Sequence, residues 1–384
     1  MRKESCADCD VIERYFLDIV EGGRYYASWM VMLNANKNEE LRMLKKLLLV
    51  AVMLVALTGS ALMAQDLMKL IPSEADFVFQ VNIQKFVSNP DVKKSLMENL
   101  EKSPEQKKAF DEFVANTGFN PMENLTQMVI FTSGKIDPKA PSQNAGAIMA
   151  GTFNPSRIFE AIKKDPNAGK DVEITKIDGF DAIVPKDKKD GFGIFLDDKT
   201  AVLGTEAGVL AVKDVKKGTN KGAASRPDFF AILQKLDINA SVSGAGLIPA
   251  DLKEKVKANP QAAPLASLNY FFFAFNHGET IEFNFNGEVD KKENVETVMT
   301  SLNGFLAMLK MITGQAPEVG EILNMVKLTA KETTVQIALS VPKAKLDEIK
   351  VKMEQRIKEM KEKGGVDVED GKDDVEVEEE TERE

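Results

Sequence analysis

The chain has 384 residues, of which 43% are hydrophobic and 29% charged, and this balance excludes fibrous proteins and wholly disordered ones. Its formal net charge of −10 is concentrated near the end, where residues 366–384 hold eleven acidic residues against Lys372 and Arg383. Residues 43–365 are close to neutral. They therefore have no overall field that would favour nucleic acid, and no nucleic-acid partner is expected.

The segment Met43–Ala64 is typical of an export signal. Lys45 and Lys46 precede eleven consecutive apolar residues at 47–57, and a stretch of small residues follows. A basic start, an apolar middle and a small-residue end are the parts of a cleavable signal peptide. We therefore expect a signal peptide at residues 43–64 and an exported protein, either periplasmic or extracellular.

An uncleaved anchor in the inner membrane, formed by residues 44–63, is the alternative interpretation. A helix needs about 20 predominantly apolar residues to cross a bilayer. Thr58, Gly59 and Ser60 interrupt the apolar run before that length is reached. The sequence therefore favours cleavage, and membrane contact is expected only where this segment stays uncleaved.

Residues 1–42 differ in kind from the rest of the chain, since they contain both cysteines and the sole tryptophan. So long an arm before a signal peptide is unusual, and we interpret residues 1–42 as a spurious upstream extension. Cys6 and Cys9 form a lone CxxC pair without a nearby histidine, which is half a zinc site at most. The body after the signal has no cysteine, so disulfides cannot stabilise it.

Residues 65–217 predict a first α+β half. Phe79 and Val81 alternate with Gln80 and Asn82, as in a strand with one buried face. Further strands are predicted near residues 127–132, 146–153, 171–177, 181–184, 191–196 and 200–204, and a short helix closes the half.

Three helices of this half have clear start signals. Asn89, Ser103 and Asn154 each precede a proline, which suits the first helical position. Ser103 with Gln106 also forms a capping-box signature. Gly118 is placed to end the second of these helices.

A polar joint at residues 216–222 leads into a second α+β half at residues 223–361. The elements predicted there are a helix around 229–233, a strand at 242–247, a helix after Pro249, a hairpin over 270–285, a helix over 295–309, a helix after Pro317, a hairpin over 327–341 and a final helix to about residue 361. Residues 362–384 are predicted to form a disordered acidic tail, because so many like charges cannot be buried.

The hairpin over 270–285 is the densest apolar stretch of the body. A strand that is apolar on both faces must be covered twice, so we expect it at the centre of the second half's sheet with the 295–309 helix on one face. Its phenylalanines either line a pocket for an apolar ligand or belong to the core; they are Phe271, Phe273, Phe275, Phe283 and Phe285.

The two halves share an order of elements: a strand, a helix, two strands, a helix, a hairpin and a closing helix. The fold class expected from this order is α+β, with two tandem, loosely repeated halves, each a mostly antiparallel sheet covered by helices.

Two stretches resemble a group of exported bacterial proteins of unknown function. They are residues 70–78, LIPSEADFV, with Asn89-Pro90 after them, and residues 117–121, TGFNP, before Asn124-Leu125. The resemblance implies a signal peptide and a duplicated α+β body over about residues 65–361. It carries no catalytic residues, because the matching motifs are turns and strand entries.

The sequence offers little for catalysis. His277 is the sole histidine, and we interpret it as an exposed turn residue, which excludes multi-histidine metal sites and leaves only carboxylate or lysine chemistry. Asp197-Asp198 and the pair Asp187 and Asp190 fall in turns, where acidic residues are common, so a cation site there is a minor alternative. We expect no catalytic residue, no cofactor and no metal.

Two other groups of residues have ordinary structural explanations. The glycines at 191–193 and 204–208 do not match a phosphate-binding loop and are interpreted as strand-turn glycines. Met308, Met311 and Met325 are expected to fill the core between helices.

The function expected from these features is that of a non-catalytic exported protein that binds a partner or helps organise the cell envelope. Its partner would be another envelope protein or an apolar ligand. The alternative is a carrier or sensor of an apolar ligand, which needs an enclosed apolar cavity of about 300 Å³ or more. A carboxylate-dependent envelope hydrolase is the weaker alternative, and it needs two or three acids clustered in a cleft.

Overall fold

The computed structural model describes residues 66–133, 144–165, 168–186, 191–260, 262–313 and 317–362. The upstream extension with its cysteine pair, the signal segment, Asp187 with Asp190, and residues 363–384 of the acidic tail lie outside these ranges.

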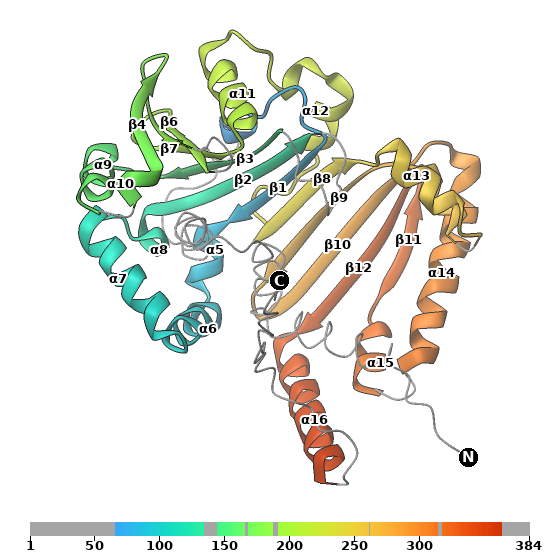
Figure 1. Cartoon of the computed structure of the whole chain (residues 1–384). Helices are drawn as coiled ribbons and strands as arrows, with labels where there is room; N and C mark the ends of the chain where they lie inside the picture. Colours follow the sequence, from blue (N-terminus) through green and yellow to red (C-terminus); the bar gives the residue numbers. More distant parts are fainter. Residues whose placement is uncertain are drawn as a thin grey trace, which may run out of the picture.

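Within the described ranges, helices combine with antiparallel strands, so the α+β class is confirmed. Twelve strands form a single sheet (Figure 1) in the order β11-β12-β10-β9-β8-β1-β2-β3-β7-β6-β5-β4. The strands are β1 (Phe77–Asn82), β2 (Leu125–Ser133), β3 (Asn144–Gly151), β4 (Val172–Ile177), β5 (Phe180–Pro185), β6 (Phe192–Phe195), β7 (Thr200–Gly204), β8 (Val242–Leu247), β9 (Leu268–His277), β10 (Thr280–Val289), β11 (Lys327–Lys331) and β12 (Thr334–Pro342).

The two halves meet in the middle of this sheet, where β1 pairs with β8 in antiparallel orientation. The sequence favours a sheet for each half, and the structure instead joins both sets of strands into one. On either side of the junction the order is β1-β2-β3-β7-β6 and β8-β9-β10-β12-β11, with the β4–β5 hairpin added to the first set. That order agrees with a tandem repeat, although the duplication itself stays a prediction.

The helices of the first half are α5 (Ile83–Ser88), α6 (Pro90–Glu101), α7 (Pro104–Thr117), α8 (Pro121–Asn124), α9 (Pro155–Lys164), α10 (Ala168–Asp171) and α11 (Glu206–Lys217). Those of the second half are α12 (Pro227–Leu233), α13 (Ala250–Lys257), α14 (Val295–Ile312), α15 (Pro317–Leu323) and α16 (Lys343–Glu362). Short 3-10 turns lie at Ala223–Ser225, Ala263–Ser267 and Lys292–Asn294.

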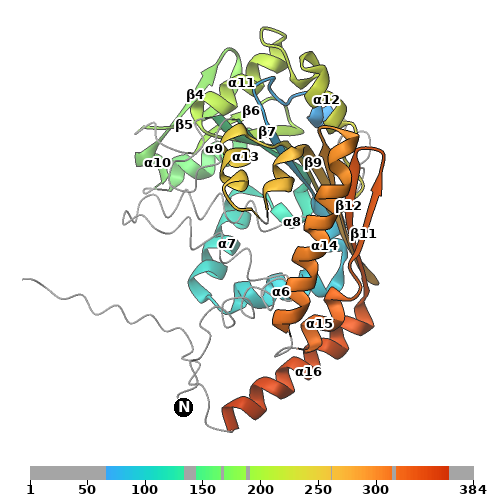
Figure 2. The same cartoon turned by 90° about the vertical axis from the view of Figure 1, so that its right-hand side faces the viewer.

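The main core lies on one face of the sheet, where α11 and α12 contribute Val209, Val212 and Phe229 against Val78 and Phe131. Smaller clusters lie on the other face. One of them includes Phe113 of α7, another includes α14, and a third joins α15 to α16. Figure 2 shows α7 and α14 on the same side of the sheet.

Most of the predicted helix signals are confirmed. The side chains of Asn89 and Asn154 accept hydrogen bonds from backbone N–H groups in the first turns of α6 and α9. Gly118 ends α7 in the left-handed region at φ 67°, which glycine adopts without strain. The capping box at Ser103 is wrong, because its side chain makes no cap hydrogen bond even though α7 begins where expected.

α14 covers the sheet only in part. Val298 near its start is fully buried, whereas Phe305 is 56%, Met308 41% and Met311 82% exposed. The prediction that Met308 and Met311 fill the core is therefore wrong, and Phe305, on the helix expected to cover the sheet, is also exposed. An 18-residue helix is about 27 Å long, whereas its neighbour β11, with five residues, spans about 17 Å. The end of the helix therefore extends beyond the strand that it covers.

We predict that Gln127→Leu stabilises the fold. Gln127 on β2 is 2% exposed, and neither atom of its amide has a hydrogen-bond partner among the described groups. Removing such a buried polar group should raise the free energy of unfolding by about 1 kcal/mol, measured by urea denaturation.

Gln80→Leu on the neighbouring strand β1 is the matched control. Gln80 donates to the carbonyl of Ile238 at 2.9 Å and accepts from Ser243 at 3.0 Å, so the same substitution there should destabilise. Equal effects at the two positions would contradict this explanation.

Candidate functional site

Six phenylalanines gather on one side of the sheet. β1 provides Phe77 and Phe79, β9 provides Phe271 and Phe273, and β10 provides Phe283 and Phe285. The register pairs Phe77 with Gly246 and Phe79 with Gly244 on β8, and these glycines pair in turn with Phe271 and Phe273 on β9. Residues that pair across neighbouring strands point to the same side. We call these six side chains the phenylalanine face.

The six rings form two rows that cross the junction between the halves. In the first row, Phe77 lies 6.0 Å from Phe271, which stacks on Phe285 at 5.7 Å with an interplanar angle of 15°. These distances join ring centroids and are within the range in which aromatic rings attract one another.

The second row is built in the same way. Phe79 lies 6.2 Å from Phe273, which lies 6.3 Å from Phe283. Each row thus links a ring of the first half to two rings of the second half.

Two glycines on β8 allow the rings to meet across that strand. A Cβ atom on Gly244 would lie 2.5 Å from the Phe273 ring, and one on Gly246 would lie 2.8 Å from Phe77. Any larger residue would push the rings outward. The glycines are therefore part of the site, although they contribute no side chain.

Helices cover the sheet on both sides of the rows and leave the rings between them half-buried. On the first-half side, Phe79 and Ile130 pack against a cluster that contains Phe113 of α7. On the second-half side, α14 covers Val335, and α15 and α16 cover Val341. The six rings each keep a partly exposed surface. The result is an apolar strip between two helical flanks.

The structure brings together most of the phenylalanines predicted from the sequence. Phe271, Phe273, Phe283 and Phe285 belong to the two rows, and Phe275 is half-buried and pairs with Phe283 on the same side of the sheet. The hairpin also lies in the middle of the second half's strands, as expected.

Sequence reasoning missed Phe77, Phe79 and the two glycines of β8. The alternation of Phe77 and Phe79 was visible, and so was that of Gly244 and Gly246. Their meaning depends on the pairing of β1 with β8, which no local pattern predicts.

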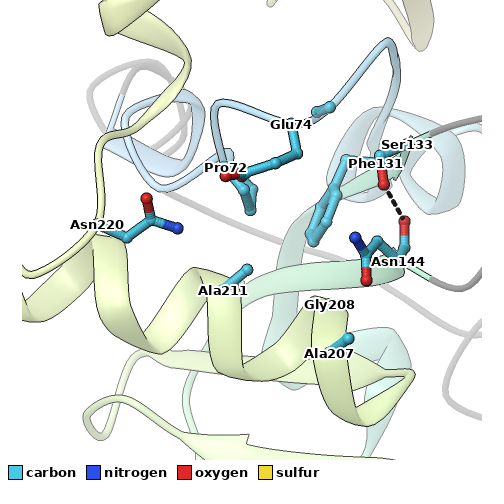
Figure 3. Close-up of a pocket in the computed structure, with 10 residues that line it drawn as sticks. Pro72, Glu74, Phe131, Ser133, Asn144, Ala207, Gly208, Ala211 and Asn220 are labelled. Atoms are coloured by element: carbon cyan, nitrogen blue, oxygen red, sulfur yellow. Dashed lines mark hydrogen bonds between the residues drawn. The ribbon is translucent and has the colours of Figure 1, made fainter.

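The pocket in Figure 3 is separate from the phenylalanine face. It has a volume of about 220 Å³ and lies beside the first turns of α11, where Ala207, Gly208 and Ala211 form one wall. Its polar groups are Glu74, Ser133, Asn144 and Asn220, and Ser133 donates to the carbonyl of Asn144 at 3.2 Å. This pocket does not provide the enclosed apolar cavity of about 300 Å³ or more that the carrier alternative requires.

The interpretation of His277 as an exposed turn residue is wrong. His277 is the last residue of β9 and is half-buried, and its Nδ1 lies 2.7 Å from Nδ2 of Asn89. β9 extends further than predicted, because His277 at its end still pairs with Ile281 of β10.

The carboxyl groups with shifted pKa values are those held by cations or hydroxyls. The hydrogen bond from Lys213 lowers the pKa of Asp178. Burial acts to raise the pKa of Asp197, but the hydrogen bonds from Lys216 and the Lys199 backbone outweigh it and lower that pKa. Ion pairing lowers the pKa of a carboxyl group in this way, whereas a general acid needs a raised pKa.

Asp197, a minor candidate for cation binding, pairs with Lys216 at 3.0 Å. In the part of the chain that the structure describes, no group of three or more His, Cys, Asp or Glu side chains is placed to hold a metal ion.

No helix among the described residues combines the length and the apolar character needed to cross a membrane.

No protein-family model and no curated protein matches this chain. Among solved structures, crystal form I of TP0453 aligns with 73% of this chain and 95% of its own length, at 9% sequence identity and a TM-score of 0.37. A likeness at this level carries no argument about function.

Proposed function

We propose that this protein is a non-catalytic, exported binding protein that holds the acyl chain of an amphiphile on its phenylalanine face. One observation carries the proposal: six half-buried rings from both halves of the chain lie on one side of the sheet in two rows, and neighbouring rings within each row touch. Contiguous apolar surface that stays partly exposed is typical of sites that bind apolar ligands or partners.

A thin chain suits this face better than a broad partner surface. The rings lie between helical flanks, and each offers only part of its surface. A flexible acyl chain can reach such rings, whereas a protein surface would meet the flanking helices first. Each Å² of apolar surface removed from water contributes about 25 cal/mol, so a chain that lies across several rings needs no polar contact to bind.

The open position of the rings argues for surface binding and against a carrier with a closed interior. An enclosed carrier needs about 300 Å³ or more of apolar cavity. The pocket beside α11 is smaller, is lined by both polar and apolar residues and contains none of the six rings.

The charges of the described residues support a non-catalytic role. Every carboxyl group with a resolved shift has a lowered pKa, including Glu288, where burial acts to raise the pKa but hydrogen bonds from Thr333 and Thr334 lower it. A carboxylate hydrolase needs a carboxyl with a raised pKa as general acid.

Export is proposed from the signal segment at residues 43–64. Mass spectrometry of the protein purified from its host should find a first residue at about 62–65. Intact material that begins at residue 1 inside the cell would contradict both export and the interpretation of residues 1–42.

Ligand binding is tested by titrating the purified full chain with a fluorescent apolar probe. The probe should bind saturably to one site, and a single-chain amphiphile below its micelle concentration should displace it. The same head group on a two-carbon chain should not. Absence of saturable binding would contradict the proposal.

A Phe305→Ser variant controls for nonspecific adsorption to α14. Phe305 is the first large residue of the exposed stripe on that helix, and it lies outside the two rows. Probe affinity should be unchanged in this variant. A strong loss of affinity would place the probe on α14 and not on the phenylalanine face.

A further inference from the structure

A contact between the two halves lies at one end of the phenylalanine face. His277 continues the alternation of Phe271, Phe273 and Phe275 along β9, so it belongs to the same side of the sheet. Its ring meets Asn89, the residue between α5 and α6, 188 positions away in the sequence. Figure 1 shows α6 and the start of α16 at the same end of the sheet.

The orientation of the Asn89 amide is fixed by the helix that it caps. Its Oδ1 accepts hydrogen bonds from the backbone N–H groups of Asp91 at 3.0 Å and Val92 at 3.4 Å. The Nδ2 group, which only donates, must therefore face the ring. Turning the amide over would break the cap, which typically stabilises a helix by about 1 kcal/mol.

This orientation requires a neutral histidine. Since Nδ2 donates, Nδ1 of His277 has to accept, and an imidazolium has no acceptor. The backbone N–H of His277 donates to the hydroxyl of Ser241 at 3.3 Å, and this hydrogen bond also holds the histidine in position. Protonation of the ring would place two donors against each other and remove the hydrogen bond.

Charged groups surround the ring from several elements. Lys343 at the start of α16 pairs with Asp91 of α6, so these two charges largely compensate each other. Lys85 of α5 donates to Oδ1 of Asn276 at 2.7 Å, next to the histidine. Glu279 follows in the turn after β9, and Lys94 lies one turn after Asp91 on α6.

The balance of these surroundings disfavours the imidazolium. Burial lowers the pKa of His277 below its ordinary value of 6.5, Lys343 lowers it further, and Asp91 opposes both. As pH falls below about 6.5, the unfolded chain takes up the proton before the folded chain does. The contribution of neutral His277 to stability is therefore complete above that pH and decreases below it.

We propose that Asn89 and His277 form a pH-sensitive clasp at one end of the phenylalanine face, and that protonation of the ring opens the clasp and weakens the binding of the apolar ligand. The clasp stands on its own geometry, whereas its effect on the ligand rests on the proposed function.

Acid weakens ligand binding for two reasons. An imidazolium on the same side of β9 as Phe275 would lose water when an acyl chain covers that side, and burying a charge without a partner is unfavourable. Loss of the Asn89–His277 hydrogen bond also removes one tie between the start of α6 and the end of β9, next to Phe275. The loss of a single net hydrogen bond corresponds to about a fivefold change in affinity.

The clasp is tested by NMR titration of the histidine ring, which needs no assignment because the full chain has one histidine. The titration midpoint in the wild-type protein should lie below 6.5, the ordinary value for histidine. An Asn89→Asp variant keeps a good helix cap but presents an anionic acceptor to the ring, so its midpoint should be higher than that of the wild type. A wild-type midpoint at or above the ordinary value, or no rise in the variant, would overturn the clasp.

The effect on the ligand is tested with the fluorescent probe at about pH 7.5 and at about one pH unit below the midpoint that the NMR titration gives for the wild-type protein. Wild-type affinity should fall by about fivefold at the lower pH, the size of one net hydrogen bond. His277→Gln supplies a neutral acceptor to Asn89 at both pH values, and its affinity should change little. An equal loss in wild type and His277→Gln would overturn the regulation.

The NMR titration and the probe titration distinguish failure of the clasp from failure of the proposed function. If the NMR titration behaves as expected and the probe binds at neither pH, the proposed function and its regulation are both wrong while the clasp stands. If the probe binds equally at both pH values, only the regulation is wrong.

Discussion

A Phe273→Ala/Phe285→Ala variant is expected to bind an apolar probe at least tenfold more weakly than the wild-type protein. The double substitution removes one ring from each row, and Phe273 is the middle ring of the second row. At about 25 cal/mol per Å², the loss of about 60 Å² of ring contact with the ligand gives about 1.5 kcal/mol, which is tenfold in affinity. Fluorescence titration at neutral pH measures this difference.

The matched control is Phe159→Ala/Phe195→Ala. These two rings also touch each other, with centroids 5.7 Å apart, but they belong to α9 and β6 and lie outside the phenylalanine face. The control removes the same number of ring atoms and should keep wild-type affinity. Equal losses in both variants would show that general loosening of the fold, and not loss of the site, reduces binding.

Gly208→Ala is expected to cause the largest loss of stability of the single substitutions considered. Gly208 lies in the first turn of α11, where a Cβ atom would be 2.3 Å from the carbonyl oxygen of Ala145 on β3. Backbone hydrogen bonds hold that strand, because the N–H of Thr205 donates to the same carbonyl at 3.0 Å. The helix would have to move away from the main core, at a cost of about 3 kcal/mol, the upper end for overpacking.

Gly304→Ala is the control within another helix. Gly304 lies in the interior of α14, and a Cβ atom added there would meet no neighbouring atom within 4 Å. Alanine is a better helix former than glycine, so this substitution should raise the free energy of unfolding by about 0.5–1 kcal/mol. Urea denaturation of both variants gives the comparison, and a loss of stability at Gly304 or none at Gly208 would contradict the packing described here.

Local sequence patterns predicted the elements that local chemistry decides. The starts of α6 and α9 follow from an asparagine cap and a proline, and the end of α7 follows from Gly118. Alternating apolar residues placed most of the strands, and the hairpin expected over 327–341 is present as β11 and β12. In each case the deciding interactions lie within a few residues.

The features that the sequence did not predict depend on partners far along the chain. Joining of the halves into one sheet requires β1 to pair with β8, and the apolar periodicity of either strand is satisfied by any antiparallel neighbour. Met308 and Met311 have helical core spacing, but whether they meet a strand depends on the relative lengths of α14 and β11.

Half of the candidate site could be predicted from the sequence, because that half depends on residues close together in the chain. The phenylalanines of the β9–β10 hairpin lie close together in the sequence and share one register. Phe77 and Phe79 reach them only across Gly244 and Gly246 of β8, and His277 meets its partner Asn89 from the other half. Only the tertiary structure combines these pieces into one strip with a polar end.

NMR of phenylalanine-labelled full chain, titrated with a single-chain amphiphile below its micelle concentration, shows whether the ligand lies on the phenylalanine face. We expect saturable shifts in the ring signals of both rows and little change at Phe159 and Phe195. Shifts confined to Phe305 on α14, or no saturable shift in either row, would contradict binding on this face.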